Sequence, residues 1–404
     1  MPSSVNSAKR ARKPLSSLHP VVIATGWVSF FTDLGSELIY PLIPIFLTVD
    51  LSASRAILGL IEGLAEGVPA IIRWVAGGIS DQLKNRKWII FTGYAISSAT
   101  KPLIGLSTTA MQALAFRVID RVGKGIRGAP RDALVADLTD ANSQGYAFGF
   151  QRMMDHAGAM IGGLVSFILV GVLALTLRNA IILSAIPGII VLVLILIFVR
   201  DKPGRQTAFT PAWRALSFRG FPGAFYLYLV SAVIFAFANS SDAFLLLRSY
   251  ELGVAVGFVP LLWVLLHLVK AVTSLWGGRL SDTLGRKPVL IFGWTLYSLV
   301  YFAFAFASAK WAPWLLFTLY GFFYGATEGT AKALVTDLVK EERRGTAFGI
   351  LGTLEGVVFI FASIIAGVLW DATGSARLPL MLSAILSLLA TLWLALFVRT
   401  KASD

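Results

Sequence analysis

Residues 132–149 read DALVADLTDANSQGYAFG, and residues 332–349 read KALVTDLVKEERRGTAFG. The two segments share nine identical residues at a constant offset of 200 positions. The same offset relates Asp155 to Glu355 and Gly125 to Gly325, and GGISDQLKNRK at residues 77–87 is echoed by GGRLSDTLGRK at residues 277–287. Such a repeat predicts two related halves, an organisation typical of membrane transporters.

The composition is that of a membrane protein. Of the 404 residues, 56% are hydrophobic and only 14% are charged, whereas about 25% of the residues in a soluble domain are charged. A membrane-spanning helix needs about 20 mostly apolar residues. Twelve segments meet this need: 21–48, 54–79, 88–107, 108–138, 146–173, 179–199, 221–247, 254–278, 288–308, 312–338, 346–370 and 378–398.

These segments predict an all-α membrane protein with twelve transmembrane helices in two pseudo-symmetric six-helix bundles. The longest polar stretch between predicted spans, from residue 201 to 222, separates six spans from six. We therefore expect a basic N-terminal tail (1–20), an N-terminal half (21–199), a central linker (200–220), a C-terminal half (221–398) and a short tail (399–404).

The net charge of +13 is explained by the membrane topology. Most of the 35 Lys and Arg residues lie in the tails and loops on one side of the predicted spans, and only Arg55, Arg178, Arg248, Lys310 and Arg377 lie on the other. Basic loops stay in the cytoplasm. This predicts a multi-pass protein of the cell (inner or plasma) membrane with both termini cytoplasmic. The lipid bilayer is then the expected partner, no nucleic acid is needed, and we expect a monomer.

Cysteine is absent from the chain, which excludes disulfides and thiolate metal sites. We expect neither a metal nor a cofactor.

A highly charged stretch, AFRVIDRVGKGIRGAPRDALVADL at residues 115–138, lies in the fourth predicted span. A charge at the bilayer centre costs about 3 kcal/mol, so such side chains face a bundle interior or a water-filled cavity. The basic residues recur every three or four positions and so share one helix face. They are Arg117, Arg121, Lys124, Arg127 and Arg131.

Other charged residues lie at a similar depth, about halfway through their spans by the helical rise of about 1.5 Å per residue. Transporters of repeated halves bind substrate near this midplane. We predict substrate contacts from Asp33, Glu37, Arg117, Arg121, Lys124, Arg127, Asp242, Lys270, Glu328 and Lys332. Asp242 ends a polar patch, Asn239 to Asp242, that could be a binding face or an outer gate.

Structural roles stay open for several residues. Arg131, Asp132 and Arg152 could brace helices or extend to the interface, and Glu62, Glu66 and Arg73 could form a structural ion-pair face. Asp137 and Asp337 are expected at the inner side. His156 and His267 could carry protons, ligate a metal or form packing hydrogen bonds.

Three motifs resemble those of the major facilitator superfamily. GRLSDTLGRK at residues 278–287 resembles the loop motif that follows the second helix of each half, although the first half has Lys84 and Asn85 where a glycine is usual. Arg121 with Gly125 resembles the fourth-helix motif of proton-linked members. GAMIGG at residues 158–163 resembles the fifth-helix signature of the antiporters, with Ala159 in place of its proline.

The resemblance implies a pathway lined by the first, fourth, seventh and tenth helices. It also implies gating loops formed by Gly77, Asp81 and Arg86 in the first half and by Gly278, Asp282, Gly285 and Arg286 in the second.

We predict a secondary active transporter that works by alternating access and exports a small charged solute in exchange for protons. An organic anion or a carboxylate metal chelate is favoured, because guanidinium groups pair with carboxylates in a bidentate way. Burial favours the protonated form of a carboxylate and a nearby cation favours the ionised form. The proton-coupling candidates are Asp33, Glu37, Arg121, Asp155, His156, Glu328 and Glu355.

Two alternatives remain. The many acids also suit a multidrug/proton antiporter for cationic or amphiphilic compounds, and a non-transporting membrane receptor or scaffold on the same fold is an alternative from another class. We do not expect an enzyme, because no acid/base or nucleophile set recurs outside the predicted spans.

Overall fold

The computed structural model describes residues 18–82, 86–140, 143–200 and 218–399, which form twelve membrane-length helical segments. The N-terminal half contains α1 (Pro20–Ile39), α2 (Ile43–Ile45), α3 (Arg55–Gln82), α4 (Arg86–Leu106), α5 (Ala110–Asp137), α6 (Gln144–Phe167), α7 (Leu177–Ile182) and α8 (Ala185–Phe198). The C-terminal half contains α10 (Gly223–Ala238), α11 (Ala243–Glu251), α12 (Val259–Leu284), α13 (Arg286–Phe306), α14 (Ala312–Leu338), α15 (Arg344–Thr373) and α16 (Arg377–Phe397).

Short irregular helices extend several of these segments. The first span continues beyond α1 through the 3₁₀ turn η2 (Tyr40–Leu42), α2 and the π-helix η3 (Phe46–Asp50). Pro41 and Pro44 lie at this change of helix type, as expected for residues that lack a backbone N–H and clash with the preceding turn. The sixth span joins α7 to α8, and η5 (Ile168–Val172), η6 (Val256–Phe258) and η7 (Glu341–Arg343) extend α6, α12 and α15.

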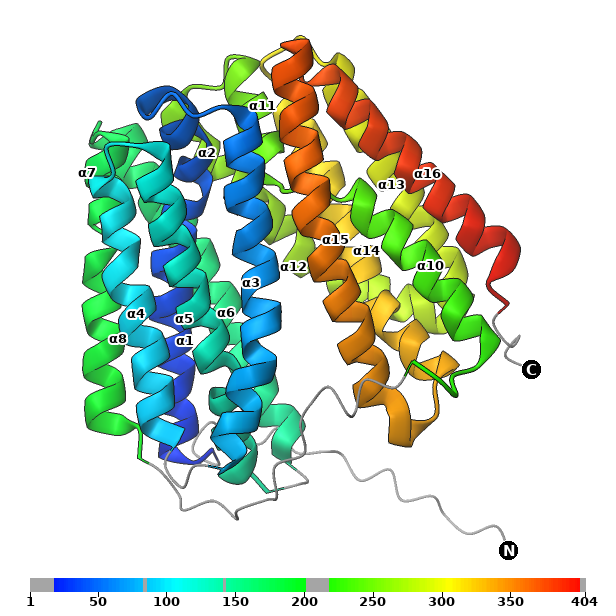
Figure 1. The fold of residues 1–404 in the computed structure, drawn as a ribbon, viewed down its shortest axis with the longest axis horizontal. Coiled ribbons are helices and arrows are strands. Elements are labelled where there is room, and N and C mark those ends of the chain that lie inside the picture. The colour runs from blue at the N-terminus through cyan, green and yellow to red at the C-terminus, as the bar shows by residue number, and fades with distance from the viewer. Residues whose placement is uncertain (1–17, 83–85, 141–142, 201–217, 400–404) are drawn as a thin grey trace, which may run out of the picture.

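The two halves repeat each other in structure as in sequence. Helix α4 (Arg86–Leu106) and helix α13 (Arg286–Phe306) have the same bounds at the offset of 200 positions, and α6 and α15 begin at Gln144 and Arg344. Figure 1 shows the N-terminal half on the left and the C-terminal half on the right, each a bundle of roughly parallel helices. The predicted twelve-helix fold in two related bundles is confirmed.

Eight of the twelve segments in the described chain are apolar enough over their length to cross a membrane on composition alone. Helices α3, α4, α5 and α14 fall short of that apolarity. Three of these, α3, α5 and α14, contribute charged side chains to the cavities described below. Their polar content therefore has a local cause in the interior between the helices.

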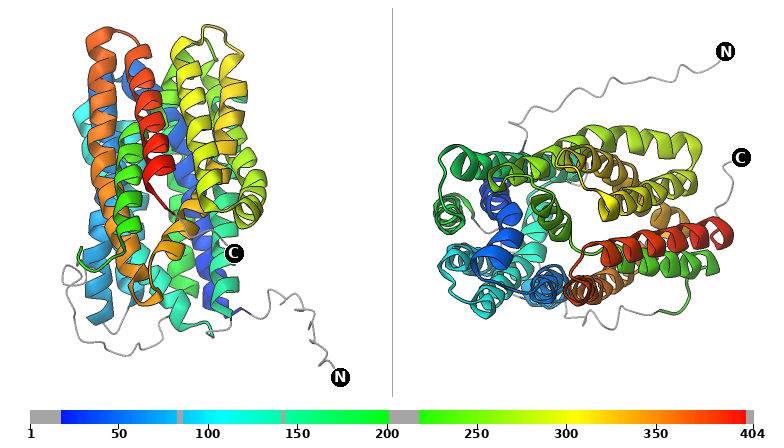
Figure 2. Two further views of the ribbon diagram at one scale, coloured as in Figure 1. Left: turned by 90° about the vertical axis from the view of Figure 1, so that its right-hand side faces the viewer. Right: turned by 90° about the horizontal axis from the view of Figure 1, so that it is seen from above.

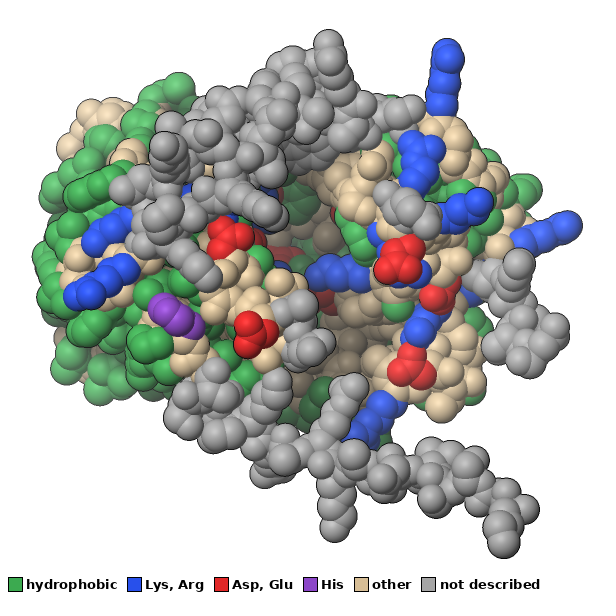
Figure 3. All heavy atoms as spheres, turned by 90° about the horizontal axis from the view of Figure 1, so that it is seen from below, with side chains coloured by type: hydrophobic (Ala, Val, Ile, Leu, Met, Phe, Trp, Pro, Cys, Tyr) green, Lys and Arg blue, Asp and Glu red, His purple; other side chains and the backbone are tan. Residues whose placement is uncertain are grey.

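The halves touch at one end of the molecule and separate toward the other. Helix α3 packs along α15, and α6 packs against α12. The separation widens toward the lower end in Figure 1, where α1 begins and α8 ends; we call this the termini face. The view from above in Figure 2 shows the same arrangement of two bundles. Seen from the termini face, the molecule is hollowed between the halves, with acidic and basic side chains inside the hollow (Figure 3).

Interactions at the closed end join α3 to the opposite half. The Asp371 carboxylate accepts backbone N–H groups of Arg55 (3.0 Å) and Ala56 (2.8 Å), so a residue of α15 caps the first turn of α3. Arg55 also pairs with Glu251 at 3.3 Å. Below this cap, Gly59, Gly63 and Gly67 of α3 allow the two helix backbones to approach closely. The closed end is thus held by both packing and polar contacts.

The seventh and eighth predicted spans differ from the observed helices. The seventh, predicted as continuous over 221–247, is interrupted between Ala238 and Ala243, so that α10 and α11 are separate. Asparagine, serine and aspartate in this interval compete with the helix for backbone hydrogen bonds, and Ser241 Oγ accepts the Ala243 N–H at 3.2 Å. The eighth, predicted to end at residue 278, continues to Leu284.

Candidate functional site

A cavity of about 260 Å³ lies between the two halves. It is lined from both bundles by Ser36, Glu37, Tyr40, Glu66, Arg117, Arg121, Lys124, Asn239, Ser240, Ser241, Asp242, Trp263, Tyr324 and Phe359. We call it the central cavity. Five of the predicted substrate contacts therefore come together here: Glu37, Arg117, Arg121, Lys124 and Asp242.

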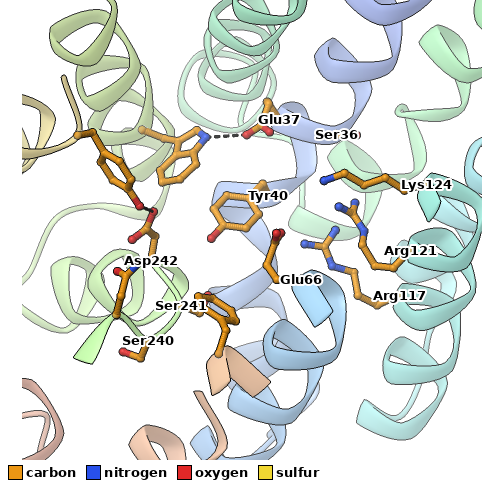
Figure 4. Close-up of a pocket in the computed structure, with 14 residues that line it drawn as sticks. Ser36, Glu37, Tyr40, Glu66, Arg117, Arg121, Lys124, Ser240, Ser241 and Asp242 are labelled. Carbon is orange, nitrogen blue, oxygen red and sulfur yellow. Dashed lines mark hydrogen bonds between the residues drawn. The ribbon is translucent and has the colours of Figure 1, made fainter. Parts of the chain in front are cut away.

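Helix α5 provides the basic wall of the central cavity. Figure 4 shows Arg117, Arg121 and Lys124 projecting side by side from α5 toward Tyr40 and Glu66. Their spacing of four and three residues places them on one face of a helix. The fourth-span face predicted from the sequence is therefore the cavity wall for these three residues.

Two of the three basic side chains are held by buried carboxylates behind the wall. Arg121 donates to Asp120 Oδ2 from Nε (2.9 Å) and Nη2 (2.7 Å), and Asp120 also accepts the Ser97 hydroxyl. Arg117 pairs with Glu62 at 3.3 Å. Lys124 has no ion pair or hydrogen bond among the described residues, which makes it the cation most available to a ligand.

The opposite wall comes from the interruption between α10 and α11. Asn239, Ser240, Ser241 and Asp242 all reach the cavity. Asp242 accepts the Tyr320 hydroxyl at 2.6 Å and the Tyr324 hydroxyl at 2.9 Å. The polar patch predicted as either a binding face or an outer gate thus lines the central cavity, and the break in the helix exposes several polar groups at one level.

One hydrogen bond crosses the cavity between the halves. The Trp263 indole of α12 donates to Glu37 Oε2 of α1 at 2.7 Å. The Tyr40 ring lies 4.6 Å from the Trp263 ring, centroid to centroid, and both rings line the cavity beside this bond. Sequence reasoning identified Glu37 but missed the two aromatic residues, because an aromatic side chain in an apolar span is indistinguishable from a lipid-facing one.

Glu66 and Asp120 are also functional candidates that the sequence prediction undervalued. The sequence leaves open whether Glu66 belongs to a structural ion-pair face with Glu62 and Arg73, and in the structure Glu66 lines the central cavity. Asp120 was only one of many charged residues in its stretch, yet it is fully buried and fixes Arg121. The sequence signal for this role was the position of Asp120 immediately before Arg121, which suggests an ion pair between the two.

Arg127 corrects one predicted substrate contact. It does not line the central cavity; it is buried against α4, with its guanidinium 4.2 Å from the centroid of the Tyr94 ring. Six residues along a helix correspond to a rotation of about 120° from Arg121. The basic residues of α5 therefore do not all lie on one helix face, and Arg127 lies outside the face that lines the cavity.

Lys270, Glu328 and Lys332 form a group in the C-terminal half, away from the central cavity. Lys270 Nζ lies 2.8 Å from Glu328, and Lys332 Nζ lies 3.9 Å from it. Glu328 and Lys332, together with Glu355, line a second cavity of about 420 Å³ instead. The charged residues predicted at the midplane are thus not gathered in one cavity.

Four predicted proton-coupling or polar residues line neither cavity: Asp33, Asp155, His156 and His267. Asp155 Oδ1 is buried without a hydrogen-bond partner within the described chain, and Arg152 lies 3.9 Å from its other oxygen. His156 is exposed on α6. The His267 ring packs edge-on against Trp263.

Arg131 braces α5 against α1 and belongs to the termini side of the fold. It donates to the neighbouring Asp132 at 2.9 Å and to the Ser29 hydroxyl at 2.9 Å.

Within the described residues, no group of three or more His, Asp and Glu side chains is arranged to hold a metal ion.

The predicted gating motif is mostly helical. Gly278 and Asp282 lie in the last turns of α12, and only Gly285, with a φ of +90°, separates this helix from α13. The expectation of a longer loop was wrong because the helix extends beyond its apolar part. Arg286 pairs with Asp282 and with Asp337 (3.3 Å). The surroundings of Gly77 and the side chain of Asp81 lie outside what the structure describes.

Equivalent ion pairs occur in the two halves at the repeat offset. Arg86 pairs with Asp137 at 2.5 Å, and Arg286 pairs with Asp337. Each pair connects the start of one helix to the end of the next, α4 to α5 and α13 to α14. Asp137 and Asp337 thus lie at the termini side, where the sequence placed them.

Comparisons with known proteins agree with this architecture. The family model described as Major Facilitator Superfamily matches residues 25–268 and 227–404. An uncharacterized MFS-type transporter of Methanocaldococcus jannaschii is 34% identical over 387 residues, which cover 93% of this chain and 94% of that protein. The hexuronate transporter of Bacillus subtilis is 25% identical over 88% of each chain. A class H tetracycline resistance protein of Pasteurella multocida is 34% identical over 31% of each chain.

Among solved structures, a bacterial homolog of the human lysosomal transporter Spinster, in an inward-facing and occupied conformation, has a TM-score of 0.77 at 16% identity. The match covers 96% of this chain and 98% of that one. At this identity the likeness concerns the fold. The relatives and structural neighbours named here are transporters or resistance proteins, and none is an enzyme.

Proposed function

Since this chain belongs to the Major Facilitator Superfamily, we propose that it is a secondary active transporter that exports a small anionic solute from the cytoplasm in exchange for protons. The observation that carries the proposal is the convergence of Arg117, Arg121 and Lys124 on a cavity between the two halves. Rocking of the halves about that cavity would expose it to each side of the membrane in turn.

The basic wall of α5 suits a carboxylate or a comparable anionic group, and the carboxylates of a metal chelate are included in this class. Arg121 uses Nε and Nη2 for Asp120 and makes no hydrogen bond from Nη1 within the described chain, so one edge of a fixed guanidinium remains for a ligand. Lys124 adds an ammonium beside it. The similarity to the hexuronate transporter of Bacillus subtilis supports this substrate class, because a hexuronate is a sugar carboxylate.

The far wall favours a ligand that carries hydrogen-bonding groups at its other end. Asn239, Ser240 and Ser241 offer an amide and two hydroxyls, and Asp242 offers a carboxylate that already accepts two tyrosine hydroxyls. A hydroxylated or zwitterionic organic acid would satisfy both walls, because its acidic group faces α5 while its hydroxyl or ammonium group faces Asp242.

Glu37 is the proton carrier that the geometry supports best. It lines the central cavity, and its bond from Trp263 connects α1 of one half to α12 of the other. Any movement that separates these helices breaks this bond and changes the solvation of the carboxylate. Such a change alters the balance between its protonated and ionised forms. Asp33, Asp155, Glu328 and Glu355 remain further candidates for proton coupling.

The orientation follows from the distribution of basic residues. Arg86, Lys87, Arg286 and Lys287 begin helices at the termini face, and cytoplasmic loops carry the excess of Lys and Arg. We therefore place the termini face in the cytoplasm, so that this conformation is open inward. The export direction rests on the antiporter-like segment at residues 158–163 and on the partial match to a tetracycline resistance protein.

A binding experiment on the purified protein tests the substrate class. Carboxylates, phosphates, ferric chelates, amino acids and cationic drugs are compared by thermal unfolding at two pH values. A ligand at 100 times its dissociation constant stabilises the fold by about 2.7 kcal/mol. Lys124→Gln is the informative variant, because it removes a cavity cation without leaving a buried carboxylate unpaired. Arg152→Gln is the control, because Arg152 is basic and exposed outside the cavity.

We expect an organic anion to stabilise the protein and the stabilisation to fall in Lys124→Gln but not in Arg152→Gln. In vesicles, the same anion should be accumulated against its gradient when a pH gradient is imposed. Glu37→Gln keeps an acceptor for Trp263 but no longer titrates, so it should retain solute exchange and lose pH-driven accumulation. Stabilisation by lipophilic cations alone, unaffected by Lys124→Gln, would instead support the multidrug alternative.

A further inference from the structure

Six charged side chains are buried almost completely in the part of the chain that the structure describes. Each has less than a tenth of its surface exposed, and all six belong to α3, α4 and α5 of the N-terminal half. They are Glu62, Lys101, Arg117, Asp120, Arg121 and Arg127. Four are basic and two are acidic, so this buried charge cluster has a surplus of positive charge when all its members are ionised.

Lys101 is the member of the cluster without a partner. It is 4% exposed, yet it makes no hydrogen bond and no ion pair within the described chain. The two acids of the cluster are already paired, with Arg117 and Arg121. The remaining base, Arg127, lies against an aromatic ring, and Lys101 has no such contact. An unpaired ammonium inside a membrane protein costs stability, so it is expected where function requires it.

Lys101 lies on the face of α4 that packs against α5. Gly93, Ser97 and Lys101 follow one another at intervals of four residues and so share that face. A Cβ atom at Gly93 would lie 2.8 Å from the Gly123 carbonyl oxygen of α5, and Ser97 donates to Asp120. Lys101 is one turn further along. The charged groups around it are those of Asp120, Arg127, Arg121 and Asp33.

The equivalent positions of the C-terminal half contain no charge. At the offset of 200 residues, Ser97, Lys101 and Asp120 are replaced by Tyr297, Tyr301 and Tyr320. These tyrosine rings contact one another, with centroids 4.1 Å apart for Tyr297 and Tyr301 and 5.9 Å apart for Tyr301 and Tyr320. A neutral side chain therefore fills the position of Lys101 in the related half, so this fold does not itself require a charge there.

We propose that Lys101 determines the specificity of the central cavity for anions through the electric field of its ammonium group, without touching the ligand. The inference rests on the proposed function, because it concerns the same anionic solute. Arg117 and Arg121 line the cavity, but each is balanced by a carboxylate behind it. Lys101 adds a positive charge that no carboxylate neutralises. Neighbouring helices lie about 8–10 Å apart, and over such a distance the protein interior screens a charge less than water does.

The test compares two sugar acids of the same carbon skeleton, the monoanion glucuronate and the dianion glucarate. Their binding to the detergent-purified full chain is measured by isothermal titration calorimetry at pH 6, since acid favours the ammonium form of lysine. Lys101→Met removes the charge and keeps a long side chain. It should weaken glucuronate binding about tenfold, as expected for a unit charge about 10 Å away at an effective dielectric of about 20. Glucarate should lose more, up to about a hundredfold.

The unfolding temperature gives a second reading of the same variant. Lys101→Met should raise it, because an apolar side chain replaces a buried ammonium without an ion pair. A residue with a merely structural role would show the opposite, lower stability and equal losses for the two anions. Lys310→Met is the matched control, because Lys310 is exposed on the segment between α13 and α14; it should leave both affinities and the unfolding temperature unchanged.

Lys101→Gln is the second variant, and it should give the same affinity losses even where its buried amide lowers stability. The inference is overturned by unchanged affinities, by equal losses for the two anions, or by failure of both variants to fold. If the wild-type protein binds neither anion, the inference and the proposed function are both contradicted. Anion binding that does not depend on Lys101 contradicts the inference alone.

Discussion

Replacement of Gly59 by alanine should open the closed end of the molecule. A Cβ atom at this position would lie 2.1 Å from the Ser363 carbonyl oxygen, 2.8 Å from its carbonyl carbon and 3.2 Å from the Ile364 Cα. All three are backbone atoms of α15, so no side-chain rotation relieves the clash. To reach ordinary contact, α3 and α15 must separate by about 1 Å at this level.

The magnitude follows from the cost of overpacking. An extra methyl group in a tightly packed contact costs about 1–3 kcal/mol. This cost is present only while α3 and α15 are together, which is the conformation open at the termini face. In a protein that alternates between two conformations, the ratio of that state to the opposite one should fall about 5- to 150-fold.

Distance measurements between spin labels can detect this shift, and the absence of native cysteine removes background labelling. Asp50→Cys and Ser375→Cys place one label on each half at the closed end. Double electron–electron resonance should give mainly a short distance in the parent protein. In Gly59→Ala, a longer distance should become a major population.

Gly149→Ala is the control, because a Cβ there has nothing within 4 Å. It should leave the label distances unchanged. An unchanged distance distribution in Gly59→Ala, with unfolding temperature also unchanged, would refute the reasoning. A lower unfolding temperature with no new distance would mean that the contact is part of a static fold and not of a movable gate.

Three further outcomes are expected. Asp371→Ala removes the acceptor for two N–H groups of α3, a cap of about 1 kcal/mol. It should increase the fraction of molecules that show the longer label distance, but by less than Gly59→Ala does. Arg121→Gln should lower the free energy of unfolding by about 3 kcal/mol, because the buried Asp120 loses its bidentate partner and keeps only the Ser97 hydroxyl and Arg117 at 3.9 Å; adding Asp120→Asn should recover most of this loss in thermal unfolding. Gly285→Ala should cost about 2 kcal/mol in the same measurement, since its φ of +90° and ψ of 158° are nearly exclusive to glycine; Gly278→Ala, with open space around it, should cost much less.

The twelve spans were predictable because each is a long apolar run, and because a repeat aligned the halves independently of hydropathy. The tenth span, predicted over 312–338, coincides with α14 (Ala312–Leu338). The interruption before α11 was harder to predict, since a short polar run inside an apolar segment is compatible with either a continuous helix or a break. Local competition for backbone hydrogen bonds decided it.

Much of the candidate site was predictable from the free-energy cost of placing a charge in lipid, because this cost forces charged residues of an apolar span to face the interior. That argument correctly brought Arg117, Arg121 and Lys124 to one cavity. It failed for Arg127, since helical spacing gives only an approximate direction and the Tyr94 ring provides an alternative burial site. It also placed Glu328 and Lys332 at the same depth as Arg121 without distinguishing one cavity from two.

By itself, the sequence determined the helices, the two-fold repeat and the set of charged residues that lie inside the bundles. These depend on local composition and periodicity, which each segment carries independently. Only the tertiary structure decided which charges neutralise each other, as Asp120 does for Arg121, and which have no ion pair among the described residues, as is the case for Lys124. Pairing depends on distances of a few ångströms between side chains on different helices, and those distances are set by how the helices pack.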